Sequence, residues 1–237
     1  YTAKPKYLVQ INRDQQAGTN GMASDFTLDT PAVQFTLPEA DKTYQFRTEI
    51  IVNNEYYVES DNITIRTDSA TPEKHNHAGE NMTNIDGKAV FPGTINRYLV
   101  TWDFDQYKGV NVDREMQEKG LQLVDKYDGN KLEAVEDVVL YDGTNIIGKA
   151  PATGGQFVDN DGQPIEGLTL TAGEEDGLKT LTIEYKKVDG AFYKQYVEGG
   201  KQLHALFKMK TLAFKGENGY GGTYANQAFQ RDFGNES

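Results

Sequence analysis

Apolar and polar side chains alternate with a period of two along much of this chain, and no other sequence feature restricts the fold as strongly. Such alternation is typical of β-strands that turn one face to a core and the other to water. Turn signals such as Asn-Asn, Asp-Gly and Gly-Gly separate the runs. The sequence therefore predicts an all-β protein built as antiparallel β-sandwiches. The predicted strands lie at 33–37, 44–52, 63–65, 97–104, 121–124, 138–141, 168–170, 181–185, 202–214 and 224–229.

Two short helices are predicted among these strands. The first covers 112–119, with Asp113 as its N-cap and Gly120 as the residue that follows its C-terminus. The second covers 191–197 and stops before Gly199. Both helices fall in the second part of the chain.

The chain is expected to contain two domains, 1–70 and 71–237. The segment 67–73 contains Pro72 and is typical of a linker. The first domain is expected to be a β-sandwich that is possibly incomplete at its N-terminus. Because the chain starts at Tyr1 without an initiator Met or a signal peptide, we expect a piece of a longer protein.

The charge and the cysteine count exclude several classes of function. The chain has 237 residues, with 24 Lys+Arg and 36 Asp+Glu, so its formal net charge is −12. General binding to nucleic acid or to anionic lipid requires a cationic face, and this charge argues against it. The absence of cysteine removes disulfides, thiolate metal sites and thiol nucleophiles. No run approaches the roughly 20 apolar residues of a membrane helix.

A few short motifs suggest ligands. His75 and His77 offer two zinc ligands within the linker region, but no third ligand follows at a clear spacing. The run 159–162 (DNDG) has a composition suited to calcium, and a type I′ turn is the preferred interpretation. The glycine-rich stretch 216–222 lacks the sequence context of a phosphate-binding loop, which favours a hairpin loop.

Several runs of the second part carry a family resemblance. In order and spacing they resemble the C-terminal domains of the streptococcal antigen I/II family of cell-wall-anchored adhesins, over most of 74–237. The matching runs are TPEK at 71–74, NIDGK at 84–88, TWDFDQYKG at 101–109, KGLQLVDKY at 119–127, FYKQYV at 192–197 and YANQAFQRDFGN at 224–235. The first domain does not share these motifs, and 44–67 resembles the later strands of a fibronectin-III or immunoglobulin-like module.

The resemblance implies tandem Ig-like (DE-variant Ig) sandwiches and a spontaneous isopeptide bond in the second one. Lys74 matches the family's lysine on the first strand and Asn226 its asparagine on the last strand. Asp125 is expected to be the assisting acid, because it ends the face that carries Leu121 and Leu123. The alternative acid is Asp103.

This sequence departs from the family where members often place a second acid, since it has Lys126 there. Were that second acid the catalytic one, the assignment of Asp125 would be wrong. The aromatic residues Trp102, Tyr98 and Phe229 are candidates for the wall that excludes water from the bond.

The chemistry of such a bond requires burial. An ammonium group is not a nucleophile, and burial lowers the pKa of a lysine by penalising its charge. The same desolvation raises the pKa of an aspartate, and the neutral acid can polarise the carboxamide.

The resemblance implies a structural stalk of a Gram-positive surface adhesin, outside the cell and anchored to the cell wall by a segment outside this chain. Expected partners of the full-length adhesin are host glycoproteins or matrix, or other bacterial cells. No cofactor is required, with calcium as an optional ligand, and the only catalysis expected is the single-turnover formation of the isopeptide bond.

Two alternatives stay open. In the first, the second domain itself binds a host glycoprotein or carbohydrate. In the second, the domain is a glycan-acting enzyme that uses a carboxylate pair among Asp103, Asp105, Asp125 and Asp128.

Overall fold

The computed structural model describes residues 6–13, 23–26, 42–52, 55–59, 63–67, 72–216, 219–220 and 222–236. The chain divides into two compact units, 1–69 and 70–237. The polar run at the start of the second unit, which includes His75 and His77, is a strand rather than a linker.

The described strands of the first unit form one antiparallel sheet in the order β2-β1-β3-β4, and β5 also pairs with β3. β3 pairs with β1 along one edge, while β4 and β5 pair with different parts of β3. The predicted strands 44–52 and 63–65 are confirmed, whereas 33–37 lies outside the described residues. The strands are β1 (Lys6–Arg13), β2 (Ala23–Phe26), β3 (Lys42–Val52), β4 (Glu55–Glu59) and β5 (Ile63–Thr67).

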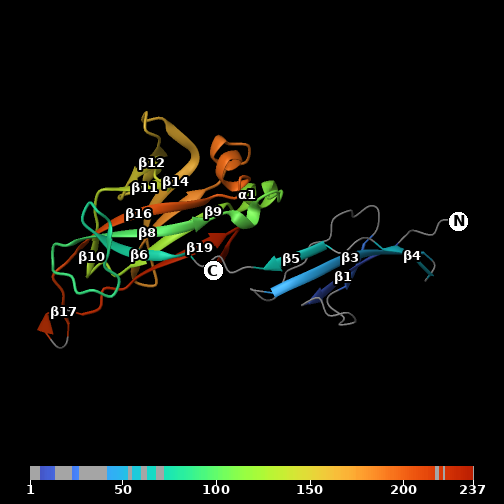
Figure 1. Cartoon of the computed structure of the whole chain (residues 1–237), viewed down its shortest axis with the longest axis horizontal. Coiled ribbons are helices and arrows are strands. Elements are labelled where there is room, and N and C mark those ends of the chain that lie inside the picture. Colours follow the sequence, from blue (N-terminus) through green and yellow to red (C-terminus); the bar gives the residue numbers. More distant parts are fainter. Residues whose placement is uncertain are drawn as a thin grey trace. The chain divides into compact units, whose positions relative to one another are not determined.

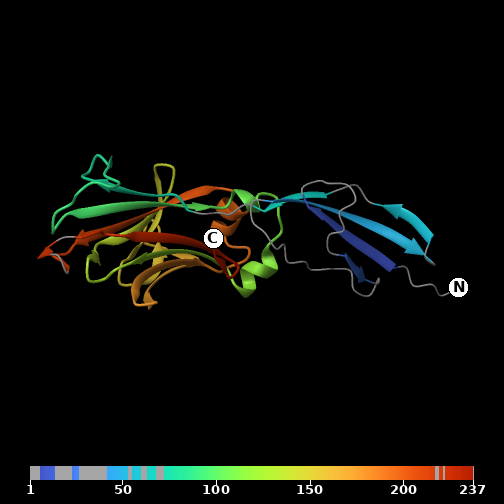
Figure 2. The same cartoon turned by 90° about the horizontal axis from the view of Figure 1, so that it is seen from below.

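The second unit is built on one large antiparallel sheet that folds over on itself into two facing layers (Figures 1 and 2), and β17 and β18 form a separate two-stranded ribbon. Its strand order is β20-β19-β9-β15-β14-β13-β12-β11-β16-β8-β6-β7, and β10 also pairs with β16. The strands of one layer are β9 (Leu121–Tyr127), β14 (Pro164–Glu175), β15 (Leu178–Tyr185), β19 (Asn226–Asp232) and β20 (Asn235–Glu236). Those of the other are β6 (Lys74–Ala78), β7 (Thr83–Asn84), β8 (Ile95–Asp103), β10 (Leu132–Ala134), β11 (Asp137–Asp142) and β16 (Gln202–Thr211).

The remaining strands are short or connect the layers: β12 (Asn145–Pro151), β13 (Gly155–Val158), β17 (Lys215–Gly216) and β18 (Gly219–Tyr220). All predicted strands from 97 onward are found, with shifted ends. The short strands β7, β10, β13, β17, β18 and β20 were not predicted, and neither was β12.

The core lies between the two layers because the strands present alternate residues to it. On β8, Tyr98, Val100 and Trp102 are buried, and the rings of Trp102 and Phe104 lie 4.8 Å apart. The opposite layer contributes Leu121 and other apolar residues of β9 and β15 to the same cluster. This core holds β6, β9 and β19 in fixed positions around the site described below.

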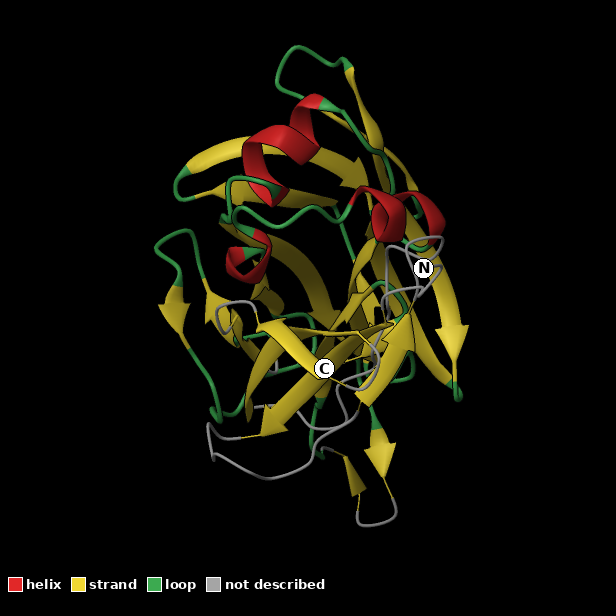
Figure 3. Cartoon of the chain, turned by 90° about the vertical axis from the view of Figure 1, so that its right-hand side faces the viewer, coloured by secondary structure: helices red, strands yellow, loops and turns green. Residues whose placement is uncertain are grey.

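Both predicted helices are present, at one end of the strands (Figures 1 and 3). They are α1 (Asp113–Glu118) and the π-helix Tyr193–Val197, and a short 3₁₀ helix covers Asp105–Tyr107. The prediction of Asp113 as N-cap is wrong. Val112 is the N-cap, and the Asn111 side chain accepts a hydrogen bond from the Asp113 N–H at 3.0 Å.

The prediction of a type I′ turn at 159–162 is also wrong. That turn needs positive φ at both central residues, and among the described non-glycine residues with positive φ neither Asn160 nor Asp161 appears. The Asp159 carboxylate instead accepts the N–H groups of Asp161 and Gln163 at 2.9 and 2.8 Å. This is an Asx-type turn, in which the aspartate side chain accepts hydrogen bonds from the backbone N–H groups of residues that follow it in the chain.

Gly120 is predicted to tolerate no side chain. It has φ +71°, and an added Cβ would lie 2.6 Å from the Tyr185 carbonyl oxygen. Gly143, at φ +60° with open space around it, is the matched control. We expect Gly143→Ala to cost about 1–2 kcal/mol of unfolding free energy from backbone strain alone, and Gly120→Ala to cost clearly more. Urea unfolding of both variants measures this, and equal losses would contradict the steric explanation.

Candidate functional site

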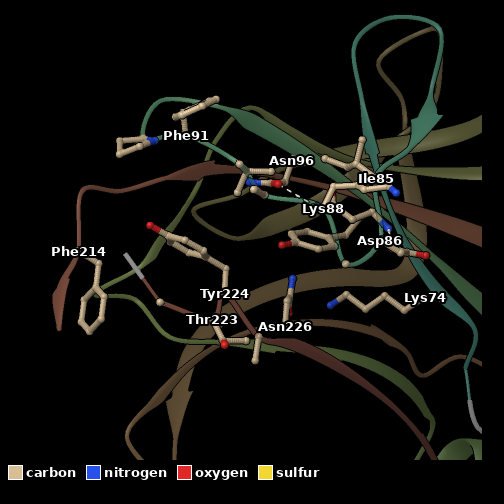
Figure 4. A pocket seen from close by; sticks show the side chains of 18 of the residues that line it. Lys74, Ile85, Asp86, Lys88, Phe91, Asn96, Phe214, Thr223, Tyr224 and Asn226 are labelled. Carbon is tan, nitrogen blue, oxygen red and sulfur yellow. Dashed lines mark hydrogen bonds between the residues drawn. The ribbon is translucent and has the colours of Figure 1, made fainter. Parts of the chain in front are cut away.

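Three strands bring Lys74, Asp125 and Asn226 to one place in the interior of the second unit. Lys74 is the first residue of β6, in one layer, and Asp125 belongs to β9, in the other. Asn226 begins β19, and the register places Ala228 opposite Asp125, so Asn226 and Asp125 lie on the same face of neighbouring strands. Figure 4 shows the side chains of Lys74 and Asn226 pointing toward one another.

Lys74 and Asp125 form a buried pair. The Lys74 Nζ donates a hydrogen bond to Asp125 Oδ1, and their side chains are 10% and 0% exposed. The Nζ also lies 4.8 Å from the centre of the Tyr98 ring. An amine and an acid are thus enclosed together between the two layers.

Burial shifts both groups toward their neutral forms. Desolvation lowers the pKa of Lys74, although the nearby carboxylate of Asp125 opposes this shift. Desolvation raises the pKa of Asp125, although Lys74 and the Asn226 side chain oppose it. In both residues burial outweighs the partner, because water is the better solvent for a charge. The pKa values of the two groups are therefore shifted in the directions that favour a neutral amine and a neutral acid.

The carboxamide of Asn226 lies against both Asp125 and Met209, and its hydrogen bond to the Asp125 carboxyl group opposes the rise in the pKa of that acid. Its Nδ2 donates to the sulfur of Met209 at 3.4 Å, and a thioether is a weak acceptor. The Asn226 Oδ1 and the Asp125 Oδ2 are both buried, and neither has a hydrogen-bond partner among the described residues. Two buried acceptors without a donor are costly.

Asp103, the alternative acid, is not at this site. It ends β8, where its Oδ1 accepts the Asp105 N–H at 2.9 Å and its Oδ2 accepts from the Gln202 side chain at 3.3 Å. Lys126 turns away from the pair, as expected for the residue that follows Asp125 on a strand, and contacts Asp176 at 2.9 Å.

Of the three aromatic residues proposed as a wall, Tyr98 contacts Lys74, whereas Trp102 packs with Phe104 and Phe192. Phe229 lies on the opposite face of β19 from Asn226, since it is an odd number of positions away. The prediction missed Met209. The sequence contained a signal for Met209, because every second residue of β16 faces the core. These buried residues are Leu203, Ala205, Phe207 and Met209.

The predicted zinc ligands do not form a metal site with other described residues, and the buried Nδ1 of His77 has no hydrogen-bond partner among them. The Nδ1 of His75 lies 2.7 Å from an Asp86 oxygen, and no group of three or more potential metal-binding acids and imidazoles occurs in the described ranges. Asp128 accepts the Asn130 N–H at 2.9 Å. Neither Asp105 nor Asp128 lines the pocket next to Lys74. Part of the glycine-rich stretch 216–222 lies outside the described residues. Gly216 of β17 pairs with Gly219 of β18 in a two-stranded ribbon.

The second unit matches a known family. The sequence model for the cell surface antigen I/II C2 terminal domain matches residues 72–237. Solved structures similar to this chain include the C-terminal domain of the Streptococcus agalactiae AgI/II polypeptide BspA, with 25% identity, 70% of this chain and 46% of that chain covered, and a TM-score of 0.48.

The C-terminal domain of the Streptococcus pyogenes antigen I/II-family protein AspA matches at 24% identity, with 70% and 49% of the chains covered and a TM-score of 0.48. The Corynebacterium diphtheriae major pilin SpaA matches at 10% identity, with 96% and 57% covered and a TM-score of 0.43.

The chain spans about half the length of the solved antigen I/II chains that it matches. No helix in the described part of the chain has the length and apolar character needed to cross a membrane. Since the family match covers more than half of the residues, this chain belongs to the cell surface antigen I/II family.

Proposed function

We propose that the second unit is a stalk domain of a bacterial surface adhesin, crosslinked by a spontaneous isopeptide bond between Lys74 and Asn226 with Asp125 as the assisting acid. The observation that carries this proposal is the enclosure of the Lys74–Asp125 pair beside a carboxamide whose oxygen has no described partner. Family membership supports it, since the residues that matched the motif come together in space.

The reaction exchanges one amide for another. The neutral Lys74 Nζ attacks the Cγ of Asn226, while the protonated Asp125 donates a hydrogen bond to Oδ1 and stabilises the developing negative charge. A bond forms between Nζ and Cγ, and the bond between Cγ and Nδ2 breaks. Asp125 passes a proton from Nζ to Nδ2, which leaves as ammonia, and the acid ends in the state in which it began.

The fold supplies the rate enhancement by holding the reactants together. Lys74 and Asn226 are fixed on strands of opposite layers, so the bimolecular step becomes an intramolecular one.

The bond joins the first strand of the unit to its last long strand. It closes a loop of 152 positions, and by analogy with a disulfide such a loop stabilises the domain by about 5 kcal/mol. A pulling force applied at the ends of the unit passes through the covalent bond and leaves the strands between Lys74 and Asn226 unloaded. This is the property that a stalk needs.

The full-length adhesin would present a separate adhesive head outside the cell, anchored to the cell wall, toward host glycoproteins, host matrix or other bacteria. The bond-forming chemistry requires no metal or cofactor, since the three side chains supply the nucleophile, the electrophile and the acid.

Intact mass spectrometry tests the crosslink. We expect the wild-type chain to be lighter than its calculated mass by one ammonia, and Lys74→Ala and Asp125→Asn to have their full calculated masses. Lys126→Ala is the matched control, because this neighbouring lysine pairs with Asp176 and should leave the loss of ammonia unchanged. A wild-type chain at its full calculated mass refutes the proposal.

Loss of the crosslink is also expected to lower the melting temperature. With a stabilisation of about 5 kcal/mol, Lys74→Ala should melt roughly 10–20 °C below the wild type. Differential scanning calorimetry measures the shift, with Lys126→Ala again as the control. A Lys74→Ala protein that melts with the wild type would show that no covalent constraint was removed.

The pH dependence of Lys74→Ala reports on Asp125. In this variant the acid loses the cation that opposed its raised pKa, so the folded state binds its proton more tightly than the unfolded chain, whose value is about 3.8. The stabilisation that comes from this tighter proton binding is therefore complete at pH values below the unfolded-state pKa, and it is lost as the pH rises through the folded-state pKa. Urea unfolding at several pH values should show this fall, and Lys74→Ala/Asp125→Asn should not. Equal slopes in the two proteins would contradict a raised pKa for Asp125.

A further inference from the structure

Gln230 is a buried amide that joins β19 to the opposite layer of the sandwich. It follows Asn226 by four positions on the same face of β19, and it is 1% exposed. Its Oε1 accepts a hydrogen bond from the Asp103 N–H at 3.1 Å, and its Nε2 donates to the Asp103 carbonyl oxygen at 2.8 Å. One side-chain amide thus pairs with both main-chain groups of the last residue of β8.

The Gln230–Asp103 pair takes the place of a further strand at the edge of β8. The Thr101 N–H donates to the Glu73 carbonyl oxygen at 2.8 Å, next to the start of β6. Asp103 lies two positions further along β8, so its N–H and carbonyl groups point to the same edge. The ladder between β6 and β8 does not extend to Asp103, and the amide of Gln230 supplies the missing donor and acceptor.

Neighbouring side chains support this pair. The Gln230 Nε2 also donates to Asp232 Oδ2 at 2.8 Å. The same oxygen accepts from the Gln106 Nε2 at 3.1 Å and from the Tyr107 hydroxyl. All of these residues belong to two of the sequence runs that carry the family resemblance, and the chemistry proposed for the crosslink does not involve them.

The main-chain ladder and the pocket do not by themselves select the register of β19. Antiparallel hydrogen bonds repeat every two residues, so a slip of two positions along β9 rebuilds a similar ladder and keeps the same face inward. Such a slip would put Tyr224 or Ala228 where Asn226 lies. The pocket of about 860 Å³ beside the crosslinking site has space for other side chains, so its size does not prevent the exchange.

The Gln230–Asp103 pair distinguishes the observed register from both slips. After a slip in either direction, Ala228 or Asp232 would occupy the position of Gln230. Alanine has no hydrogen-bonding group in its side chain, and an ionised aspartate has no donor. The main-chain groups of Asp103 would lose their partners, and a buried group without a partner is costly. A single buried polar side chain fixes register in this way in coiled coils.

We propose that Gln230 is a positioning residue for the crosslinking reaction, which sets the register of β19 and thereby brings Asn226 to Lys74. This inference rests on the proposed function of the second unit. Attack by an amine requires the reacting atoms to lie about 3–3.5 Å apart. A slip by two residues moves a strand by about 7 Å and takes the carboxamide out of reach. Gln230 acts through the position of its strand and takes no part in making the bond.

Intact mass measured over time after cell-free synthesis of the full chain tests this role. Gln230→Met keeps the length of the side chain and removes its strong hydrogen-bonding groups, so we expect it to lose ammonia at least about tenfold more slowly than the wild type. Leu140→Ala is the matched control, because it empties part of the core at β11, which β16 separates from β8. It should lose ammonia at the wild-type rate. A wild-type rate in Gln230→Met overturns the proposal.

Gln230→Glu provides a readout that general destabilisation would not move. A carboxylate can accept the Asp103 N–H but has no donor, whereas the protonated acid restores the donor to the Asp103 carbonyl oxygen. The nearby titratable groups are the carboxyl groups of Asp103 and Asp232 and the Tyr107 hydroxyl, and like charges favour the protonated form.

We therefore compare the rate of ammonia loss in each variant with that of the wild type at the same pH. The ratio for Gln230→Glu should rise about threefold or more between about pH 7.5 and pH 5.5, while the ratio for Gln230→Met stays constant. Equal behaviour of the two variants would contradict a role for the donor.

A background without the crosslink separates this inference from the crosslink itself. Hydrogen exchange followed by NMR should show the β19 amides exchanging about tenfold faster in Lys74→Ala/Gln230→Met than in Lys74→Ala. Were the wild type to keep its ammonia, the crosslink would be refuted, and the exchange comparison would still decide whether Gln230 fixes β19. Unchanged exchange in β19 overturns the proposal whatever the mass of the wild type.

Discussion

The removal of Lys74 and Asp125 from water is the constraint on which the rest of the second unit depends. Taking two charges into an apolar interior costs several kcal/mol each, and their attraction offsets this only in part. A lysine and an aspartate that give up their charges avoid much of that cost, and the shifts in their pKa values have this direction. In the proposed crosslink, an interaction that is a weak source of stability as an ion pair becomes a source of chemical reactivity.

The arrangement of the sheet explains why this enclosure falls where it does. The continuous sheet folds over through β12 and β13, which leaves β6 and β19 near the two free ends of the strand order. Only the short strands β7 and β20 lie beyond them. The proposed bond between Lys74 on β6 and Asn226 on β19 would therefore fasten the side of the sandwich that the described hydrogen-bonded ladder leaves open. The buried ring cluster around Trp102 holds the layers at the spacing that the contact requires.

Sequence patterns predicted the parts of this fold that alternate strongly. β8 and β9 were found because their buried residues recur at every second position, and the same parity pointed Asp125 inward with Leu121 and Leu123. β6 has the sequence KHNHA, which gives the strand no apolar face. The alternation pattern therefore predicts no strand there. Met209 and the pocket escaped prediction for another reason. The alternation of β16 indicates that Met209 faces inward, but it does not pair β16 with the strand that carries Asn226. The pocket lies between segments more than a hundred positions apart, 85–92 and 222–226, which a local pattern does not encode.

The place of Asn226 in the chain order has a consequence for biogenesis. Its strand is the last long one among the described strands of the unit, so in the proposed crosslink the electrophile becomes available only when almost all of this unit is present. A chain that crosses a membrane in an extended form cannot carry a closed covalent ring of such size through a narrow channel. With one reacting group near each end of the unit, the proposed ring would stay open during such a transit and close only after the two layers have met. The position of Asn226 would thus keep the unit free of a covalent ring until it has folded.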